Sequence, residues 1–208
     1  MSDGCAGGVD TNTAYDYKTE TNSNRELLKI ELKGLKGGHS GMDINSGRAN
    51  ANLLMNRVIQ SLTEVGDVRI VELQGGSLRN AIPRESFGIL AVNSSEVEAV
   101  KGQFNKIIEE ISIEYSVVEP KMVASMTMST EVRSSMMSKE DQNKIISVIY
   151  ATPNTVWKMS DKIEGLVETS SSFAKVIIKD GKFITQSLQR SMSESGKKDV
   201  ATAMKLHY

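Results

Sequence analysis

The sequence predicts an α+β fold: a ferredoxin-like β-α-β-β-α-β antiparallel sheet with helices on one face, extended by a second α-β-β-α part. Three observations support this prediction. Apolar residues alternate in several short segments, as in half-buried strands, and recur at helical spacing in the longer segments between them. Near the C-terminus, Asp180-Gly181 separates two strand-like runs, which is a strong signal for a two-residue hairpin turn.

The first unit is expected over residues 26–130. Leu28, Ile30 and Leu32 alternate with polar residues in its first strand. A helical stripe follows over residues 46–63, and a capping box of Ser95 and Glu98 predicts the start of a second helix. The four strands are predicted at residues 26–35, 68–73, 86–92 and 122–128.

The remaining residues are assigned to two further segments. Residues 1–25 are rich in Gly, Ser, Thr and Asn and are interpreted as a linker or entry loop. Residues 131–208 form the second part, which we expect to extend the first sheet or pack on it. Its predicted elements are a helix starting at Ser138, hairpin strands at 165–179 and 182–191, and a last helix at 193–208.

Composition and charge exclude several classes of protein. The chain has 208 residues, with 25 basic and 26 acidic side chains and a net charge of −1, which argues against a nucleic-acid binder. No apolar run approaches the roughly 20 residues that span a bilayer, and the first residues do not form a signal peptide. A single cysteine, Cys5, fits a reducing cytoplasm. With only two histidines, the chain cannot build a histidine-rich metal centre, so no metal ligands are predicted.

His39 lies in the most informative segment, Leu35-Lys-Gly-Gly-His-Ser-Gly41, which follows the first predicted strand. Glycines on both sides allow backbone conformations that are closed to other residues and allow close approach to a ligand. A histidine held there can donate a hydrogen bond or carry a positive charge into a cleft. Without further context, a loop histidine that caps a turn is the simpler interpretation.

Four stretches of sequence together resemble one family. They are Gly4–Val9, Gly34–Gly41 with Ser46–Ala51, Gly75–Glu85, and Ala151–Asn154 with Gly165–Ser170. The chain resembles the aminoacyl-histidine dipeptidase (Xaa-His dipeptidase, peptidase D) family of two-zinc metallopeptidases over nearly its whole length.

The resemblance implies that the chain is the lid and dimerisation domain of such an enzyme. In the family, a separate catalytic domain holds both zinc ions, and its metal-ligand motifs do not occur in this sequence. Residues 1–25 would then be the entry linker from that domain. The implied partners are a dipeptide substrate, the catalytic domain and a second copy of the chain. The fragment is expected to be inactive alone.

The resemblance also implies roles for three residues. His39 would be catalytic, because the family's lid histidine stabilises the oxyanion that forms when the peptide carbonyl is attacked. Asn80 would contact the substrate backbone or carboxylate, although an Asx-turn is the alternative and the neighbouring Arg79 could serve instead. Arg190 would bind the substrate carboxylate, and a solvated charge at a strand end is the alternative.

Two positions depart from the family pattern. Asn45 stands where the family commonly has histidine, and Ser172 stands where it commonly has asparagine, so substrate preference is left open. Ser170, beside Glu168 and Thr169, is not interpreted as a hydrolase nucleophile because no nucleophile elbow surrounds it. His207 is expected to be a helix-surface or packing residue.

Two other functions remain open. The chain could be a stand-alone ferredoxin-like module for oligomerisation or ligand sensing. It could also be the lid of a related zinc exopeptidase or deacylase with other substrates.

Overall fold

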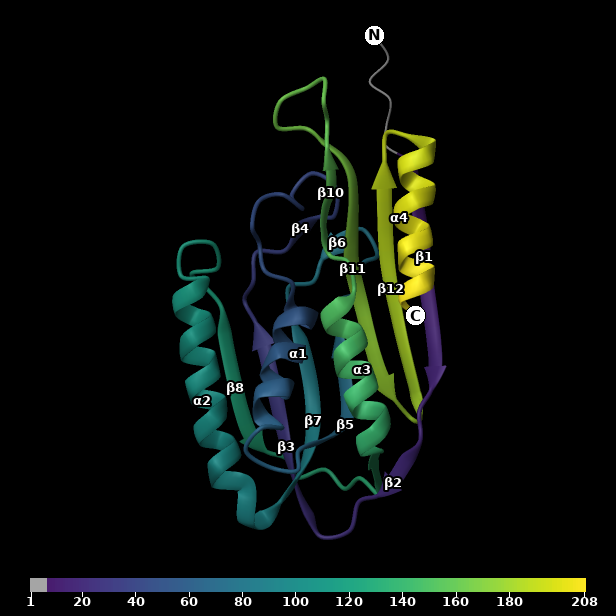
Figure 1. Ribbon diagram of the computed structural model, residues 1–208. Coiled ribbons are helices and arrows are strands. Elements are labelled where there is room, and N and C mark those ends of the chain that lie inside the picture. Colours follow the sequence, from purple (N-terminus) through teal and green to yellow (C-terminus); the bar gives the residue numbers. More distant parts are fainter. Residues whose placement is uncertain (1–6) are drawn as a thin grey trace.

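The computed structural model describes residues 7–208 (Figure 1). Its centre is an eight-stranded antiparallel sheet with the order β1-β12-β11-β5-β7-β3-β8, in which β10 also pairs with β11. The sheet strands are β1 (Gly7–Asp16), β3 (Arg25–Lys33), β5 (Arg69–Gly75), β7 (Ser86–Asn93), β8 (Val123–Met128), β10 (Thr155–Met159), β11 (Val167–Lys179) and β12 (Lys182–Ser191). Two short ribbons pair β2 (Thr19–Thr21) with β9 (Ser135–Met137) and β4 (Gly38–His39) with β6 (Ala81–Ile82). The helices are α1 (Ala51–Leu62), α2 (Val97–Glu114), α3 (Lys139–Ala151) and α4 (Glu194–His207).

The predicted ferredoxin-like unit is present. Its elements follow one another as β3, α1, β5, β7, α2 and β8, and its strands are ordered β5-β7-β3-β8. Figure 1 shows α1, α2 and α3 side by side on one face of this sheet. Leu28, Ile30 and Leu32 are buried in the main core, whereas Lys29 and Lys33 on the other face are exposed. The alternation that predicted β3 therefore reflects one fully covered face, while the other face is covered only at Leu27, which is buried in a second, smaller cluster with Met136.

Both helix starts in this unit differ from the predictions. Helix α1 begins at Ala51 instead of residue 46, because Asn50 is its N-cap and its Oδ1 accepts from the amides of Asn52 (3.0 Å) and Leu53 (3.4 Å). Helix α2 follows a 3₁₀ turn at Ser94–Glu96, and its N-cap Glu96 makes no capping bond. The capping box predicted there is therefore wrong.

Residues 7–16 are not a loop. They form β1, which pairs with β12 over ten successive residues from Gly7↔Ser191 to Asp16↔Lys182. Side-chain bonds add to this ladder: Thr11 Oγ1 donates to Gln189 Oε1 at 2.7 Å. The composition of this segment suggested a loop, but its backbone groups find their partners on a strand about 170 residues away. Farther along the predicted entry loop, Thr19–Thr21 form strand β2, and residues 1–6 lie outside the described residues.

The second part extends the first sheet, as expected, through the long strand β11. The first half of β11 pairs with β10, which was not predicted, and the second half pairs with β5. Between these two pairings the backbone of Phe173 is bonded by side chains: its N–H donates to Asn154 Oδ1 (2.9 Å), and Asn50 Nδ2 donates to its C=O (2.7 Å). The predicted turn between β11 and β12 is present, with positive φ at both Asp180 (50°) and Gly181 (77°).

Candidate functional site

The short ribbon β4–β6 brings His39 and Asn80 together. His39 pairs with Ala81, and the Ser40 N–H donates to the C=O of Asn80 at 3.0 Å. The ribbon therefore joins the β3–α1 connection to the β5–β7 connection at one end of the sheet, the upper end in Figure 1. The side chain of His39 is half-buried, and Asn80 is exposed.

Arg190 reaches the same place from β12. Successive strand residues point to opposite faces, and Ser191 lies against α4 at Gly196, so Arg190 points to the face away from α4. Gly41 lies there between the two candidate side chains. A Cβ added to Gly41 would lie 3.0 Å from Arg190 Cδ and 3.4 Å from His39 Cε1. The three residues singled out in the sequence are thus brought together by three separate segments.

Two backbone amides fix the tautomer of the His39 ring. Nδ1 accepts from the N–H of Gly41 at 3.2 Å and from the N–H of Met42 at 3.1 Å. A ring nitrogen that accepts hydrogen bonds carries no hydrogen, so the neutral imidazole holds its hydrogen on Nε2. This assignment comes from the hydrogen-bond pattern. The ring therefore offers Nε2–H as a donor to a ligand.

The backbone around His39 is held by an ion pair. The His39 N–H donates to Asp43 Oδ2 at 2.8 Å, and Asp43 Oδ1 pairs with Arg48 Nη2 at 3.0 Å. Arg48 Nη1 in turn donates to the C=O of Gly37 at 2.6 Å. Gly38 has φ of 147°, and a Cβ there would collide with the Arg48 guanidinium. Glycine at this position therefore leaves room for the Asp43–Arg48 ion pair next to His39.

Arg190 has no anionic partner among residues 7–208, and its Nε is buried without a hydrogen bond. The hydroxyls of Ser40 and Ser172, two buried residues, also lack partners within the described chain. Buried side-chain atoms without a partner also occur elsewhere, for example at Asn52, Asp67 and Arg69, so what distinguishes Arg190 is a cation with no carboxylate partner among residues 7–208. Arg79, the alternative to Asn80, is instead paired with Asp10.

Glu119 is a residue of this region that the sequence did not reveal. Its carboxylate is 3 % exposed and accepts from the N–H of Lys36 at 2.7 Å and from the N–H of Ala49 at 3.0 Å. The partners in these contacts are 83 and 70 residues apart in the sequence, so no local motif could predict them. Asp43 and Arg48 were also not predicted, although both lie within ten residues of His39.

Thr169 and His207 form hydrogen bonds within the fold. Thr169 and Ser191 share a hydrogen bond of 2.8 Å between their hydroxyls, beneath α4. His207 Nε2 donates to the C=O of Val148 at 2.8 Å, which agrees with a packing role. A cavity of about 510 Å³ lies next to β4 and β6 between Gln74 and Phe87, and none of the three candidate residues lines it.

In the part of the chain from residue 7 onward, no group of three or more His, Cys, Asp or Glu side chains is arranged to hold a metal ion. Within the same residues, no helix has the length and apolar character needed to cross a bilayer.

Comparison with known proteins supports the resemblance seen in the sequence. Residues 30–118 match the family model of the peptidase dimerisation domain. The chain is 35 % identical to the cytosol non-specific dipeptidase of Escherichia coli K12 over 202 residues, which is 97 % of this chain and 41 % of that protein. The crystal structure of aminoacylhistidine dipeptidase from Vibrio alginolyticus matches with a TM-score of 0.91 and 35 % identity, covering 98 % of this chain and 41 % of that one.

The chain therefore spans about two fifths of the length of each relative. The predicted resemblance to a dipeptidase is confirmed by both matches, and the predicted α+β fold agrees with the matched structure. Residues 30–118 thus match the model of a peptidase dimerisation domain, within a chain that is similar over nearly its whole length to part of two dipeptidases.

Proposed function

We propose that this chain is the lid and dimerisation domain of a cytoplasmic zinc dipeptidase, in which His39, Asn80 and Arg190 complete the substrate site. One observation carries the proposal. Two segments bring a histidine with a free Nε2–H and an arginine without an anionic partner among residues 7–208 to either side of Gly41. A donor and an unpaired cation at one place suit a ligand that has both an oxyanion and a carboxylate.

In this proposal, His39 acts on the peptide carbonyl. Attack on that carbonyl places negative charge on its oxygen, and a donor that is already oriented stabilises the charge without reorganisation. The fixed tautomer of His39 provides such a donor. Arg190 offers a guanidinium that pairs bidentately with the free carboxylate of a dipeptide, and the exposed Asn80 amide can donate and accept toward its backbone.

Zinc belongs to this proposal only through the resemblance, which assigns it to a catalytic domain. The described residues do not fit a zinc site, because no suitable group of ligands occurs among them. When bound in the parent enzyme, zinc would supply the activated water for hydrolysis. We therefore expect residues 1–208 alone to hydrolyse no dipeptide, with or without added zinc.

The proposed partners and location follow from the relatives. The matched family is described as a dimerisation domain, which supports a homodimer. A cytoplasmic location is supported by the name of the Escherichia coli relative and by the single cysteine. That relative is called non-specific, whereas the Vibrio alginolyticus relative is named for histidine dipeptides, so we propose dipeptides as the substrate class without a fixed side chain.

The test is His39→Ala in the full-length parent enzyme. Loss of one oriented oxyanion donor typically lowers the rate about 10²- to 10³-fold, so kcat for dipeptide hydrolysis should fall by that factor. The zinc content, measured by metal analysis, should stay unchanged because His39 is not a ligand. An unchanged kcat, or a loss of zinc that matches the loss of rate, would contradict the assigned role.

A further inference from the structure

The connection that carries His39 pairs with β6 at its middle, and one buried carboxylate attaches both of its ends to the rest of the domain. Residues 34–50 link β3 to α1, and Glu119 binds this connection at both of its ends. One carboxylate oxygen accepts from Lys36 N–H, three residues before His39, and the other accepts from Ala49 N–H, ten residues after it. The connection is therefore closed into a loop whose two ends are fixed to the same side chain.

Glu119 is itself held firmly. It lies in the turn after α2, where its N–H donates to the C=O of Tyr115 at 2.7 Å and its C=O accepts from Met122 N–H at 3.0 Å. Its side chain is 3 % exposed, and no Lys or Arg side chain among the described residues pairs with it. Placing a carboxylate inside a protein without a cation is costly unless its oxygens accept hydrogen bonds. The two backbone amides supply those bonds.

From these contacts we infer that Glu119 is a positioning residue for His39, and this inference rests on the proposed function. Asp43 and Arg48 fix the shape of the loop from within, as their bonds to His39 N–H and Gly37 C=O show. Those bonds lie within the loop, whereas β6 and Glu119 bind it from outside. The β6 pairing fixes the backbone at His39, and Glu119, from a segment beyond α2, fixes the two ends of the loop. It sets the place of the His39 ring without touching a ligand.

The substitution Glu119→Gln tests this inference without changing the size of the side chain. A carboxylate accepts at both oxygens, whereas an amide accepts at one end and donates at the other. One of the two backbone N–H groups would then face an NH₂ group, and that end of the loop would be released. Displacement of a catalytic group by about 1 Å can cost about 10²-fold in rate. In the full-length parent, kcat should fall roughly 10- to 100-fold while KM stays within about twofold.

Gln142→Glu is the matched control. Gln142 is also buried and also binds two backbone groups, since its Oε1 accepts from Ile70 N–H at 2.7 Å and its Nε2 donates to the C=O of Val68 at 2.8 Å. In Gln142→Glu a carboxylate oxygen, which only accepts, would face the C=O of Val68 at the opposite end of the sheet. This substitution should lower the Tm at least as much as Glu119→Gln and leave kcat within about twofold. Equal losses of kcat in the two variants would show that Glu119 is merely structural.

A double-mutant cycle separates action through His39 from any other effect. In the His39→Ala background, Glu119→Gln should change kcat by less than about twofold, because the group that it positions is gone. If Glu119→Gln lowers kcat by the same factor with and without His39, the inference is wrong while the proposed function stands. If His39→Ala alone leaves kcat unchanged, the proposed function fails and the inference fails with it.

A second variant covers the case in which Glu119→Gln does not fold. Glu119→Asp keeps the charge but shortens the side chain by one CH₂, so it can reach only one of the two amides. It should also lower kcat with little change in KM. Full activity in a folded Glu119→Asp enzyme would overturn the inference.

Discussion

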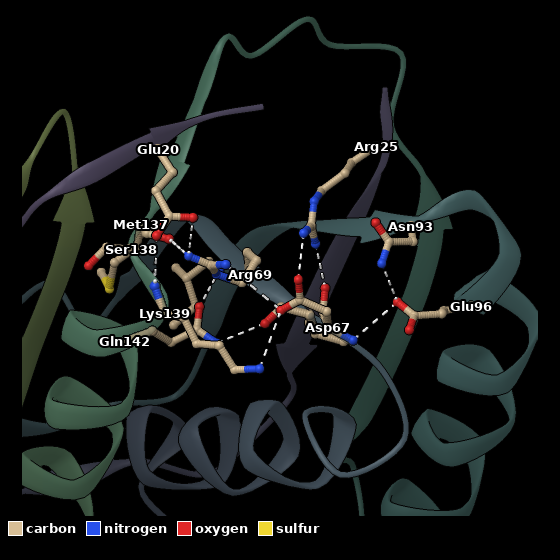
Figure 2. Close-up of polar contacts among 12 residues, drawn as sticks. Glu20, Arg25, Asp67, Arg69, Asn93, Glu96, Met137, Ser138, Lys139 and Gln142 are labelled. Carbon is tan, nitrogen blue, oxygen red and sulfur yellow. Dashed lines mark hydrogen bonds and ion pairs between the residues drawn. The ribbon is translucent and has the colours of Figure 1, made fainter. Parts of the chain in front are cut away.

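At the end of the sheet where β3 and β5 begin, the two arginines Arg25 and Arg69 each pair with a carboxylate of the same chain. Asp67 pairs with Arg25 at 2.5 Å, and Arg69 pairs with Glu20 at 2.8 Å, as Figure 2 shows. At the opposite end, the Arg190 guanidinium has no carboxylate partner among residues 7–208.

The two arginines, Arg69 and Arg190, lie at opposite ends of one sheet and differ in what surrounds them. The side chain of Arg69 is buried, donates to the C=O of Met137 at 2.8 Å and thereby holds the β2–β9 ribbon to the sheet. Arg190 lies beside Gly41 and forms no ion pair with the residues that the structure describes. Removing one member of a buried ion pair destabilises a fold, whereas a cation without a protein partner is available to a ligand.

The largest effect that separates the two ends should come from Arg69→Met. The variant removes the ion-pair partner of Glu20 and one of the cations near Asp67. It also leaves the buried C=O of Met137 without its hydrogen-bond donor. Removing one member of a buried ion pair typically costs about 3–5 kcal/mol, and the partial exposure of Glu20 puts the expected loss near the lower limit, about 3 kcal/mol. Urea unfolding at neutral pH measures this loss. In the full-length parent, kcat and KM of the folded fraction should not change.

The same substitution at the other end, Arg190→Met, should have the reverse profile. The free energy of unfolding should change by less than about 1 kcal/mol, because no ion pair is broken. The KM for dipeptides should rise roughly 10- to 100-fold, since a hydrogen bond to a charged group is worth about 1.5–3 kcal/mol. A dipeptide whose C-terminus is amidated provides the control, because its weaker binding should not depend on Arg190. If the variant instead unfolds as easily as Arg69→Met, Arg190 is a structural residue.

The elements that the sequence predicted well depend on local patterns. The alternation of Leu28, Ile30 and Leu32 identified β3, and Asp180-Gly181 identified the β11–β12 turn. Helix α3 begins at Lys139, directly after the predicted start Ser138, which is its N-cap and whose Oγ accepts from Asp141 N–H at 3.2 Å. In each case the signal and the interaction that causes it lie within a few residues of one another.

The features that were missed depend on distant partners. Strand β1 contains glycine, threonine and asparagine, and it is a strand because β12 supplies its hydrogen bonds. Helix α1 starts late because Asn50, besides capping it, also donates to the backbone of Phe173. In the candidate site, His39 stands out by its glycines, whereas Glu119 has no local pattern. A sequence can identify the group that would meet a ligand more easily than the group that holds it in place.

The smallest expected difference between the two ends is their response to acid. Burial raises the pKa of Asp67, but the hydrogen bond and charge of Arg25, with the charges of Arg69 and Lys139, outweigh it and hold the pKa below its usual range. Protonation of Asp67 is therefore less favourable in the folded chain than in the unfolded one. The stability that this carboxylate provides is fully present above the unfolded pKa, about 3.9, and is lost as the pH falls through the lower folded value.

Asp67→Asn isolates this contribution from those of other carboxylates. Urea unfolding of the original chain and of the variant should differ most at about pH 5 to 7, and the difference should shrink as the pH falls below about 4. Glu119→Gln serves as a reference, because Glu119 lies outside the Asp67 network. A change in the pH dependence of unfolding that both variants share therefore does not come from Asp67. A gap between the original chain and Asp67→Asn that stays constant down to about pH 2 would show that the Asp67 ion pairs do not contribute to stability through its charge.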